Sequence, residues 1–297
     1  MAEPHGEAPP PPHHPALEPA SIAALLRAAS TALAALADTT PRLEAELLLC
    51  EATGWTRTRL IAWPEHRVEA PARARFEGLL ARRLAGEPIA YLRGRQAFWS
   101  LELLVTPATL IPRPETELLV ELTLERLPST AQAHVADLGT GSGAIALALA
   151  HERPRWRLIA TDRSSAALAV ARENRRSLAL ANLDLVQADW LQPFRDHSLD
   201  AIVSNPPYVA VDDPHLCQGD LRYEPREALT PGGDGLGAYR SILADARRCL
   251  RPGGWLILEH GYDQGPAVRQ ILDRAGFRNS QTIPDLAGQG RVSLART

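Results

Sequence analysis

The chain contains no lysine, so all 32 of its basic residues are arginines. Without lysine it can form neither a lysine Schiff base nor a phosphate-binding P-loop. Cysteine is scarce as well: Cys50, Cys217 and Cys249 lie far apart and form no C-x-x-C pair, which argues against zinc and favours a reducing compartment. The longest aliphatic run, residues 144–150, is far shorter than the about 20 residues of a membrane helix, and the N-terminus lacks a signal-peptide pattern. We therefore expect a cytoplasmic protein with no metal site and no membrane partner.

What is present is typical of a folded protein of about two average domains. The 297 residues are 45% hydrophobic and 23% charged. The arginines are nearly balanced by 35 acidic residues, and no region has the strong basic excess of a phosphate-backbone binder. Direct binding of nucleic acid is therefore not expected.

Four regions follow from the patterning. Residues 1–18 are rich in Pro, Ala and Glu and cannot bury enough apolar surface to fold, which predicts a disordered tail. Residues 19–94 contain apolar positions at helical spacing, with helices expected from residue 21, from Pro41 to Gly54 and from about Pro71 to Ala85, and form a small helical bundle. Residues 95–107 alternate with a period of about two, which predicts a β-hairpin connector.

The remainder, residues 108–297, alternates between strands and helices, which is typical of an α/β domain with a mostly parallel sheet. Strands are predicted near 134–138, 157–161, 183–187, 199–203 and 255–259, and shorter ones at 281–283 and 291–295. Seven strands in all are therefore expected.

A glycine-rich turn follows the first of these strands: Gly139, Thr140, Gly141, Ser142 and Gly143. Bare glycine backbone at the start of a helix lets a ligand approach closely and favours a negatively charged group. The spacing also satisfies the dinucleotide fingerprint G-x-G-x-x-G/A through Ala144. An NAD-dependent dehydrogenase therefore remains an alternative at this stage.

Two further residues are expected at the same edge of the sheet. Asp162 ends the second predicted strand, where its carboxylate could accept hydrogen bonds from a ribose diol, although it could also cap the next helix. Trp190 follows the third strand and could lie against an adenine, although a packing tryptophan would look the same in sequence.

The segment Asn205-Pro206-Pro207-Tyr208 follows the fourth predicted strand. Two successive prolines cannot continue a sheet, so the chain must leave it as a rigid turn whose carbonyls have few local donors. The Asn205 side-chain oxygen, the Pro206 carbonyl and the Tyr208 ring would then suit a planar NH2 group. If this motif stood alone, a stiff loop that binds no ligand would be the simpler interpretation.

An amide or exocyclic amine nitrogen is a poor nucleophile because its lone pair is delocalised, so it requires an activated electrophile such as a sulfonium methyl donor. Fixed acceptors that hold both N–H groups would orient the lone pair and stabilise the positive charge that develops on nitrogen. No titratable base is required, so we expect a pH–rate profile that is flat near neutrality.

Taken together, these stretches resemble class I S-adenosylmethionine-dependent methyltransferases, and more narrowly the glutamine N5-methyltransferases that modify peptide chain release factors. The resemblance covers nearly everything after the tail. Its most distinctive part is residues 110–117, Leu-Ile-Pro-Arg-Pro-Glu-Thr-Glu, and it also includes 86–89, 98–101, 223–225 and 258–261.

The resemblance implies a Rossmann-like domain that binds S-adenosyl-L-methionine and methylates the glutamine of the Gly-Gly-Gln loop in a release factor, with the helical domain 19–94 docking this protein substrate. It also implies that residues 139–143 line the methionine part of the cofactor, Asp162 its ribose and Trp190 its adenine. Asn205, Pro206, Pro207 and Tyr208 would bind the target amide; Asn205, Pro206 and Tyr208 would be catalytic, and Asn205 would also border the cofactor.

Three other functions stay open from sequence. The Asn-Pro-Pro-Tyr segment is also similar to that of methyltransferases acting on exocyclic amines of nucleobases in RNA or DNA, although those would require a basic binding surface. An NAD-dependent dehydrogenase is the second possibility, but it would leave the double proline unexplained. The third is a protein that binds the cofactor and docks a partner without catalysing a reaction. Glu259 and His260 end the fifth predicted strand, where they could belong to the site or only support it.

Overall fold

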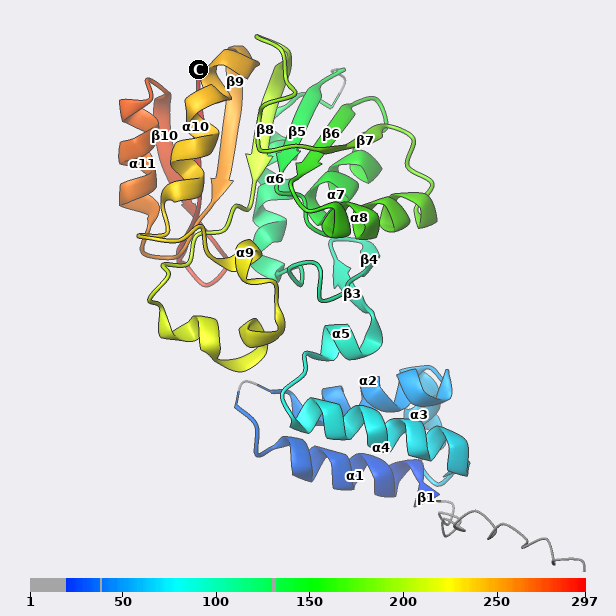
Figure 1. Ribbon diagram of the computed structural model, residues 1–297. Coiled ribbons are helices and arrows are strands. Elements are labelled where there is room, and N and C mark those ends of the chain that lie inside the picture. Colours follow the sequence, from blue (N-terminus) through cyan, green and yellow to red (C-terminus); the bar gives the residue numbers. More distant parts are fainter. Residues whose placement is uncertain (1–19, 38, 130–131) are drawn as a thin grey trace, which may run out of the picture. The chain divides into compact units, whose positions relative to one another are not determined.

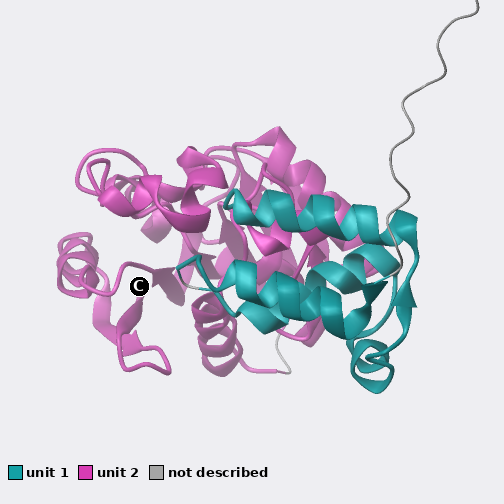
Figure 2. Ribbon diagram, turned by 90° about the horizontal axis from the view of Figure 1, so that it is seen from below, with its two compact units in different colours: residues 1–86 teal, residues 87–297 magenta. Residues whose placement is uncertain are grey.

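The computed structural model describes residues 20–37, 39–129 and 132–297 (Figure 1). The chain divides into two compact units, residues 1–86 and 87–297 (Figure 2). The predicted tail, residues 1–18, lies outside the described residues. The division comes earlier than the boundary at residue 94 that the sequence suggests, because the helix at 89–93 packs with the second unit. No helix in the described ranges combines the length and apolar composition needed to cross a membrane.

The described part of the first unit is the small helical bundle that the sequence predicts. Ser21 caps the first helix by accepting a hydrogen bond from the N–H of Ala24, and Gly54 ends the second in a left-handed conformation. A short antiparallel ladder pairs residues 20–21 with 67–68. The elements are β1 (Ala20–Ser21), α1 (Ile22–Leu33), α2 (Pro41–Thr53), α3 (Arg57–Ala62), β2 (Arg67–Val68) and α4 (Ala70–Leu84).

The second unit begins with α5 (Ile89–Arg93) and the predicted hairpin, which consists of β3 (Arg95–Phe98) and β4 (Leu101–Leu104). Phe98, Leu101 and Leu103 are buried in the core of the second unit, whereas Glu102 and Leu104 are exposed. This alternation is the period-two pattern of a half-buried hairpin.

One seven-stranded sheet organises the second unit, in the order β10-β11-β9-β8-β5-β6-β7 (Figure 1). Strands β9, β8, β5, β6 and β7 run parallel, whereas β11 is antiparallel to both of its neighbours. All seven predicted strands are present, which confirms the predicted Rossmann-like fold. Their bounds are β5 (His134–Leu138), β6 (Arg157–Asp162), β7 (Leu183–Gln187), β8 (Leu199–Ser204), β9 (Leu250–Glu259), β10 (Arg278–Pro284) and β11 (Gly290–Arg296).

Helices cover both faces of this sheet. Val135, Val203 and Ile257 belong to the apolar cluster of α6 (Glu117–Arg126) and α7 (Ala144–Glu152). Their neighbours Ala136, Ile202 and Leu256 belong to the cluster of α10 (Gly237–Cys249) and α11 (Gly265–Arg274). Successive strand residues therefore face opposite layers, which explains why these strands are apolar almost throughout. Of the other two helices, α8 (Ser165–Ser177) packs on β6 and β7, and the short α9 (Arg226–Leu229) lies in the segment between β8 and α10.

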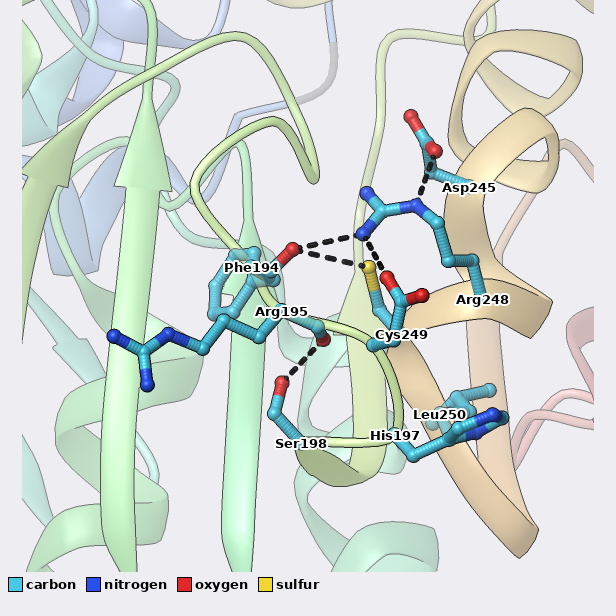
Figure 3. A network of polar contacts seen from close by, with 9 residues as sticks. Phe194, Arg195, His197, Ser198, Asp245, Arg248, Cys249 and Leu250 are labelled. Carbon is cyan, nitrogen blue, oxygen red and sulfur yellow. Dashed lines mark hydrogen bonds and ion pairs between the residues drawn. The ribbon is translucent and has the colours of Figure 1, made fainter.

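A polar network fixes the amino ends of β8 and β9 (Figure 3). Arg248, in the last turn of α10, donates to the Phe194 carbonyl at 2.9 Å and pairs with Asp245 at 2.8 Å. The N–H of Ser198 donates to the carbonyl of Cys249 at 2.9 Å. Because β8 starts at the next residue, Leu199, these bonds set where the strand begins. They lie at the edge opposite the carboxyl ends, where α/β sheets bind ligands, so we regard the network as structural.

Candidate active site

A cavity of about 430 Å³ opens at the carboxyl ends of the parallel strands and is formed by residues of the second unit alone. This volume lies within the range of about 300–1,000 Å³ that small-molecule and cofactor sites occupy. Its walls come from the turns after β5, β6, β7 and β8 and from segments 108–110 and 225–241. Six of the predicted site residues line it: Gly139, Gly141, Asp162, Trp190, Asn205 and Pro207.

The other predicted site residues are not among those that line this cavity. Thr140, Ser142 and Gly143 are buried within the glycine loop, and Pro206 is buried in the turn after β8. Tyr208 is half-buried and points its hydroxyl toward Glu259, at the end of β9. These residues are not part of the cavity wall, whereas Asn205 and Pro207 of the same turn are.

The glycine loop between β5 and α7 has three glycines with positive φ: 69° at Gly139, 57° at Gly141 and 89° at Gly143. The N–H of Gly139 donates to the carbonyl of Thr161 at 2.8 Å, which holds the loop against β6. A Cβ on Gly141 would point into open space, whereas one on Gly143 would lie 2.8 Å from Cδ1 of Leu147. Gly141 therefore leaves room for a ligand, and Gly143 lets α7 begin close to the loop.

Asp137, the last but one residue of β5, was not singled out from sequence. Its Oδ2 accepts hydrogen bonds from the Thr140 hydroxyl at 2.6 Å and from the N–H of Ala146 at 3.2 Å. Its Oδ1 is buried and has no hydrogen-bond partner within the part of the chain that the structure describes. Burial raises the pKa of the Asp137 carboxyl to about 7, the hydrogen bonds oppose this, and the charge of Asp162 adds to it. Asp137 is not among the residues that line the cavity, so this carboxyl supports the glycine loop from behind the surface of the site.

Asp162 ends β6 and faces the cavity. Its Oδ2 accepts from the N–H of Gly141 and its Oδ1 from the N–H of Ser164, both at 2.9 Å. The cap of α8 is Ser164, whose hydroxyl accepts from the N–H of Ala167 at 3.2 Å. Asp162 thus supports the residue that caps the helix, and each of its oxygens keeps acceptor capacity for a ligand.

Trp190 forms an apolar wall beside the glycine loop. Its Cζ3 lies 3.5 Å from where a Cβ on Gly139 would be, which is an ordinary van der Waals distance, so the ring lies directly beside the loop. Its backbone has a positive φ of 46°, and its carbonyl accepts a hydrogen bond from the Thr161 hydroxyl at 3.3 Å. The ring is half-buried and available on one side for a flat apolar group.

The Asn-Pro-Pro-Tyr turn leaves the sheet directly after Ser204, the last residue of β8. Asn205 Nδ2 donates to the Thr116 hydroxyl at 3.2 Å. Among the described residues, no hydrogen bond ends on Asn205 Oδ1 or on the Pro206 carbonyl. At the far end of the turn, the Tyr208 carbonyl accepts from Gln264 Nε2 at 2.9 Å. The turn is held at both ends, and two acceptors remain available between them.

Thr116 and Glu259 support this turn from inside. The carboxyl of Glu259 is 1% exposed, and its Oε1 accepts a long hydrogen bond of 3.4 Å from the Tyr208 hydroxyl. Burial raises the Glu259 pKa to about 7, opposed by the nearby polar side chain of Thr116 and by the charge of Arg291. Thr116 lies in the distinctive 110–117 stretch, but nothing in sequence indicated which member of that stretch would reach Asn205.

His260, left open from sequence, belongs to a structural network. Its ring is buried, Nδ1 donates to the Gly261 carbonyl at 2.8 Å, and Nε2 accepts from the Ser293 hydroxyl at 2.9 Å. Burial lowers the pKa of its imidazole, which favours the neutral ring. His260 is not among the residues that line the cavity.

The outer wall of the site joins two distant segments. Glu224 is buried, accepts from the N–H of Ile111 at 3.1 Å and forms an ion pair with Arg113. Helix α9 and its flanking residues follow, and this segment contributes to the cavity wall Pro225, Glu227, Ala228, Thr230, Pro231, Gly237, Ala238 and Ser241. Of the loop 231–234, only Pro231 is among the residues that line the cavity.

This arrangement combines a carboxylate at a strand end, an apolar ring, a glycine loop beside an unpartnered carboxyl oxygen, and a rigid turn with free acceptors. Such a site can hold a polar ligand that carries a diol and a flat ring. The acceptors of the turn can hold an NH2 group at the edge of the same cavity.

Comparison with known proteins covers both units. The family model of the PrmC N-terminal domain matches residues 24–94, and that of the methyltransferase small domain matches residues 115–282. The release factor glutamine methyltransferase of Xylella fastidiosa strain Temecula1 is 49% identical over 264 residues, which cover 89% of this chain and 96% of that protein. The protein of the same name from Pseudomonas aeruginosa is 51% identical over 255 residues, which cover 86% and 92% of the two chains.

Among solved structures, a methyltransferase from Pyrococcus furiosus matches with a TM-score of 0.50 and 21% identity, over 74% of this chain and 98% of that one. At this identity the likeness concerns the fold alone.

Proposed function

The chain belongs to the release factor glutamine methyltransferase family, and we propose that it methylates the side-chain amide nitrogen, N5, of the glutamine in the Gly-Gly-Gln motif of peptide chain release factors, with S-adenosyl-L-methionine as the methyl donor. It is an S-adenosylmethionine-dependent protein-glutamine methyltransferase. Because release factors work in the cytoplasm, the proposal also places the enzyme there.

The observation that carries the assignment of the acceptor is the turn after β8. Asn205 Oδ1 and the Pro206 carbonyl are free acceptors on a backbone that two prolines make rigid. A glutamine side chain ends in an NH2 group with two N–H donors, which is the complement of two acceptors. Asn205 and Pro206 would bind these donors, and Pro207 and the ring of Tyr208 would border the flat amide.

These contacts perform the catalytic work that the chemistry demands. The amide lone pair is delocalised toward the carbonyl, and two acceptors on the N–H groups stabilise the positive charge that develops as the new bond to carbon forms. They also hold the nitrogen in line with the methyl carbon, which replaces a random encounter by a fixed geometry. The proton on the product nitrogen is strongly acidic and leaves to water or to a carbonyl of the turn.

When bound, S-adenosyl-L-methionine would supply the methyl group from its positively charged sulfur; the carbon–sulfur bond would break as the carbon–nitrogen bond forms, and a neutral thioether would leave. The residues of the cavity fit such a molecule: Asp162 would accept from its ribose hydroxyls, and Trp190 would border its adenine. The glycine loop, Gly139, Thr140, Gly141, Ser142 and Gly143, would approach its methionine part, and Asn205 would border both ligands.

We assign docking of the protein substrate to the helical N-terminal unit. A release factor is far larger than the cavity, so its recognition requires surface outside the site.

The decisive experiment is methyl transfer from radiolabelled S-adenosyl-L-methionine to purified release factor. The matched control is the same release factor with the Gly-Gly-Gln glutamine replaced by asparagine, whose amide is one methylene closer to the backbone. Total RNA and DNA are offered in parallel. We expect label in the wild-type release factor alone, whereas label in nucleic acid alone would overturn the proposal.

A further inference from the structure

Gln264 joins the far end of the Asn-Pro-Pro-Tyr turn to the end of β9. It stands at the N-cap of α11, where Ser, Thr, Asp or Asn is usual, but within the described structure its side chain makes no capping bond to that helix. Its Oε1 accepts instead from the N–H of Gly261 at 3.0 Å, and its Nε2 donates to the carbonyl of Tyr208 at 2.9 Å. A glutamine at this position therefore serves the turn and not the helix.

The orientation of this amide follows from its two partners. A backbone N–H can only donate and a backbone carbonyl can only accept, so the oxygen of Gln264 must face Gly261 and its nitrogen must face Tyr208. Both distances lie in the normal range for N–H···O hydrogen bonds. The amide is therefore a fixed bridge between the segments that follow β8 and β9, which are neighbours in the sheet.

A third segment approaches the same carbonyl. Gly235 precedes α10 and has a φ of 76°, and a Cβ added there would clash with the carbonyl oxygen of Tyr208 and lie 3.0 Å from Gln264 Nε2. Only a residue without a side chain allows the backbone to come this close. Gln264 and the bare backbone of Gly235 together enclose the far end of the turn.

The double proline does not fix the turn without these contacts. At its near end, the Ser204 hydroxyl donates to the carbonyl of Leu138 at 2.7 Å, which ties the turn to β5. Proline locks φ but leaves ψ free, so a turn held only at this end could still rotate and carry the Pro206 carbonyl away from Asn205 Oδ1. A second anchor at the far end removes this freedom.

We propose that Gln264 is a positioning residue, which acts through the Tyr208 carbonyl to hold the two acceptors of the turn where the glutamine NH2 group must bind. The inference rests on the proposed function, because it concerns the acceptors for that group. Gln264 is not among the residues that line the cavity. Its loss should therefore lower kcat and leave the affinity for S-adenosyl-L-methionine unchanged.

The first test is Gln264→Met, which keeps the length of the side chain and removes both hydrogen bonds. We expect kcat for methylation of the release factor at saturating cofactor to fall by roughly 10–100-fold, because a misplacement of about 1 Å has an effect of this order. The cofactor Kd, measured by calorimetry, should not change. The matched control is Gln187→Met at the end of β7, where Gln187 Nε2 donates to the Arg163 carbonyl at 3.1 Å. This control should keep its kcat.

Gln264→Glu separates positioning from a general loss of structure. A carboxylate only accepts, so one of its oxygens would repel the Tyr208 carbonyl oxygen, whereas a protonated carboxyl can donate to that carbonyl and accept from the N–H of Gly261, as the amide does. Facing a carbonyl oxygen disfavours the ionised form, so the new carboxyl should take up its proton above the usual acidic range. We expect the ratio of variant to wild-type kcat to rise at least about threefold from about pH 8 to about pH 5.

Dividing by the wild-type rate at each pH cancels the titration of the groups around this bridge. They lie on every segment that meets there: Tyr208, Asp234, Arg240, Glu259, His260, Asp263, Arg269 and Arg291.

A pair of glycine variants tests the same anchor without changing Gln264, and keeps the inference testable if the Gln264 variants do not fold. Gly235→Ala must displace the Tyr208 carbonyl, whereas Gly232→Ala, in the same loop and with a φ of 84°, would have no atom within 4 Å of the added Cβ. We expect kcat of Gly235→Ala to be at least about tenfold below that of Gly232→Ala.

Full kcat in Gln264→Met would overturn the inference, as would an equal loss in the Gln187 control. So would a kcat ratio of Gln264→Glu that does not change with pH, or equal kcat values of the two glycine variants. Failure of the proposed function looks different, because wild type would then label no release factor at any pH.

Discussion

Replacing Asn205 by alanine tests the acceptor role of the turn most directly. The side chain donates one hydrogen bond of 3.2 Å to Thr116, and its loss should cost about 1 kcal/mol of unfolding free energy. Because the free energy of unfolding of a domain is about 5–15 kcal/mol, Asn205→Ala should remain folded. The oxygen is a preorganised contact to developing charge, and loss of such a contact costs about 10²–10³-fold in kcat, or about 3–4 kcal/mol.

The assay is single-turnover methylation of the release factor at saturating S-adenosyl-L-methionine, with cofactor affinity measured separately by calorimetry. We expect the chemical rate to fall by roughly 10²-fold or more while the cofactor Kd changes little, because Gly141 and Asp162 keep their positions.

Asn182→Ala is the matched control. Asn182 Nδ2 donates to three backbone carbonyls, of Ala150, Arg153 and Trp156, at 3.1–3.2 Å, and the residue is not among those that line the cavity. This variant should lose more stability than Asn205→Ala and keep its chemical rate. Near-normal turnover of Asn205→Ala would refute the acceptor role, as would a rate loss matched by the control.

Three further predictions concern the cofactor loop and the buried carboxyls. Gly141→Ala should weaken cofactor binding by at least tenfold, because its methyl group would enter the open space of the cavity. Gly54→Ala is the matched control, because Gly54 has a similar φ of 73° and an added Cβ there would also have no atom within 4 Å. It should show the same small loss of stability in thermal unfolding and no change in cofactor binding. Equal cofactor affinity of the two variants would contradict the prediction. Asp162→Ala should raise the cofactor Kd by roughly 10–100-fold, since a charged hydrogen bond is worth about 1.5–3 kcal/mol, and calorimetry that finds an unchanged Kd would remove the ribose assignment. Finally, burial raises the pKa values of Asp137 and Glu259 to about 7, above their values in the unfolded chain, so both stabilise the fold at low pH and this stability is lost as the pH rises through about 7. Urea unfolding of the ligand-free protein should therefore give a lower free energy of unfolding at about pH 8.5 than at about pH 5.5, by at most about 2 kcal/mol per group. Glu259→Gln should remove the contribution of Glu259, and an unchanged pH dependence of unfolding in that variant would argue against the raised pKa.

The sequence by itself determined the parts that depend on local chemistry. Glycine at 139, 141 and 143 is required by positive φ, and this requirement is visible without a structure. The double proline after Ser204 excludes a continuing strand in any fold. Strands that are apolar throughout indicate a sheet covered on both faces, and parallel strands place their carboxyl ends at one edge. The Rossmann-like fold, the helical bundle, the hairpin and the residues around the cavity follow from these rules and from the resemblance.

Only the tertiary structure decided how distant segments meet beneath that edge. Thr116 and Asn205 are far apart in the chain, and their hydrogen bond exists because the 3₁₀ turn before α6 lies against the end of β8. Glu259 has a raised pKa because three segments close over it, and exclusion of water is a property of packing and not of residue type. Asp137 is likewise indistinguishable from an ordinary strand residue in sequence, and only the structure shows that its Oδ1 is buried without a hydrogen-bond partner among the described residues. Burial and long-range hydrogen bonding, which set the charge and orientation of catalytic groups, have no local signature in the sequence.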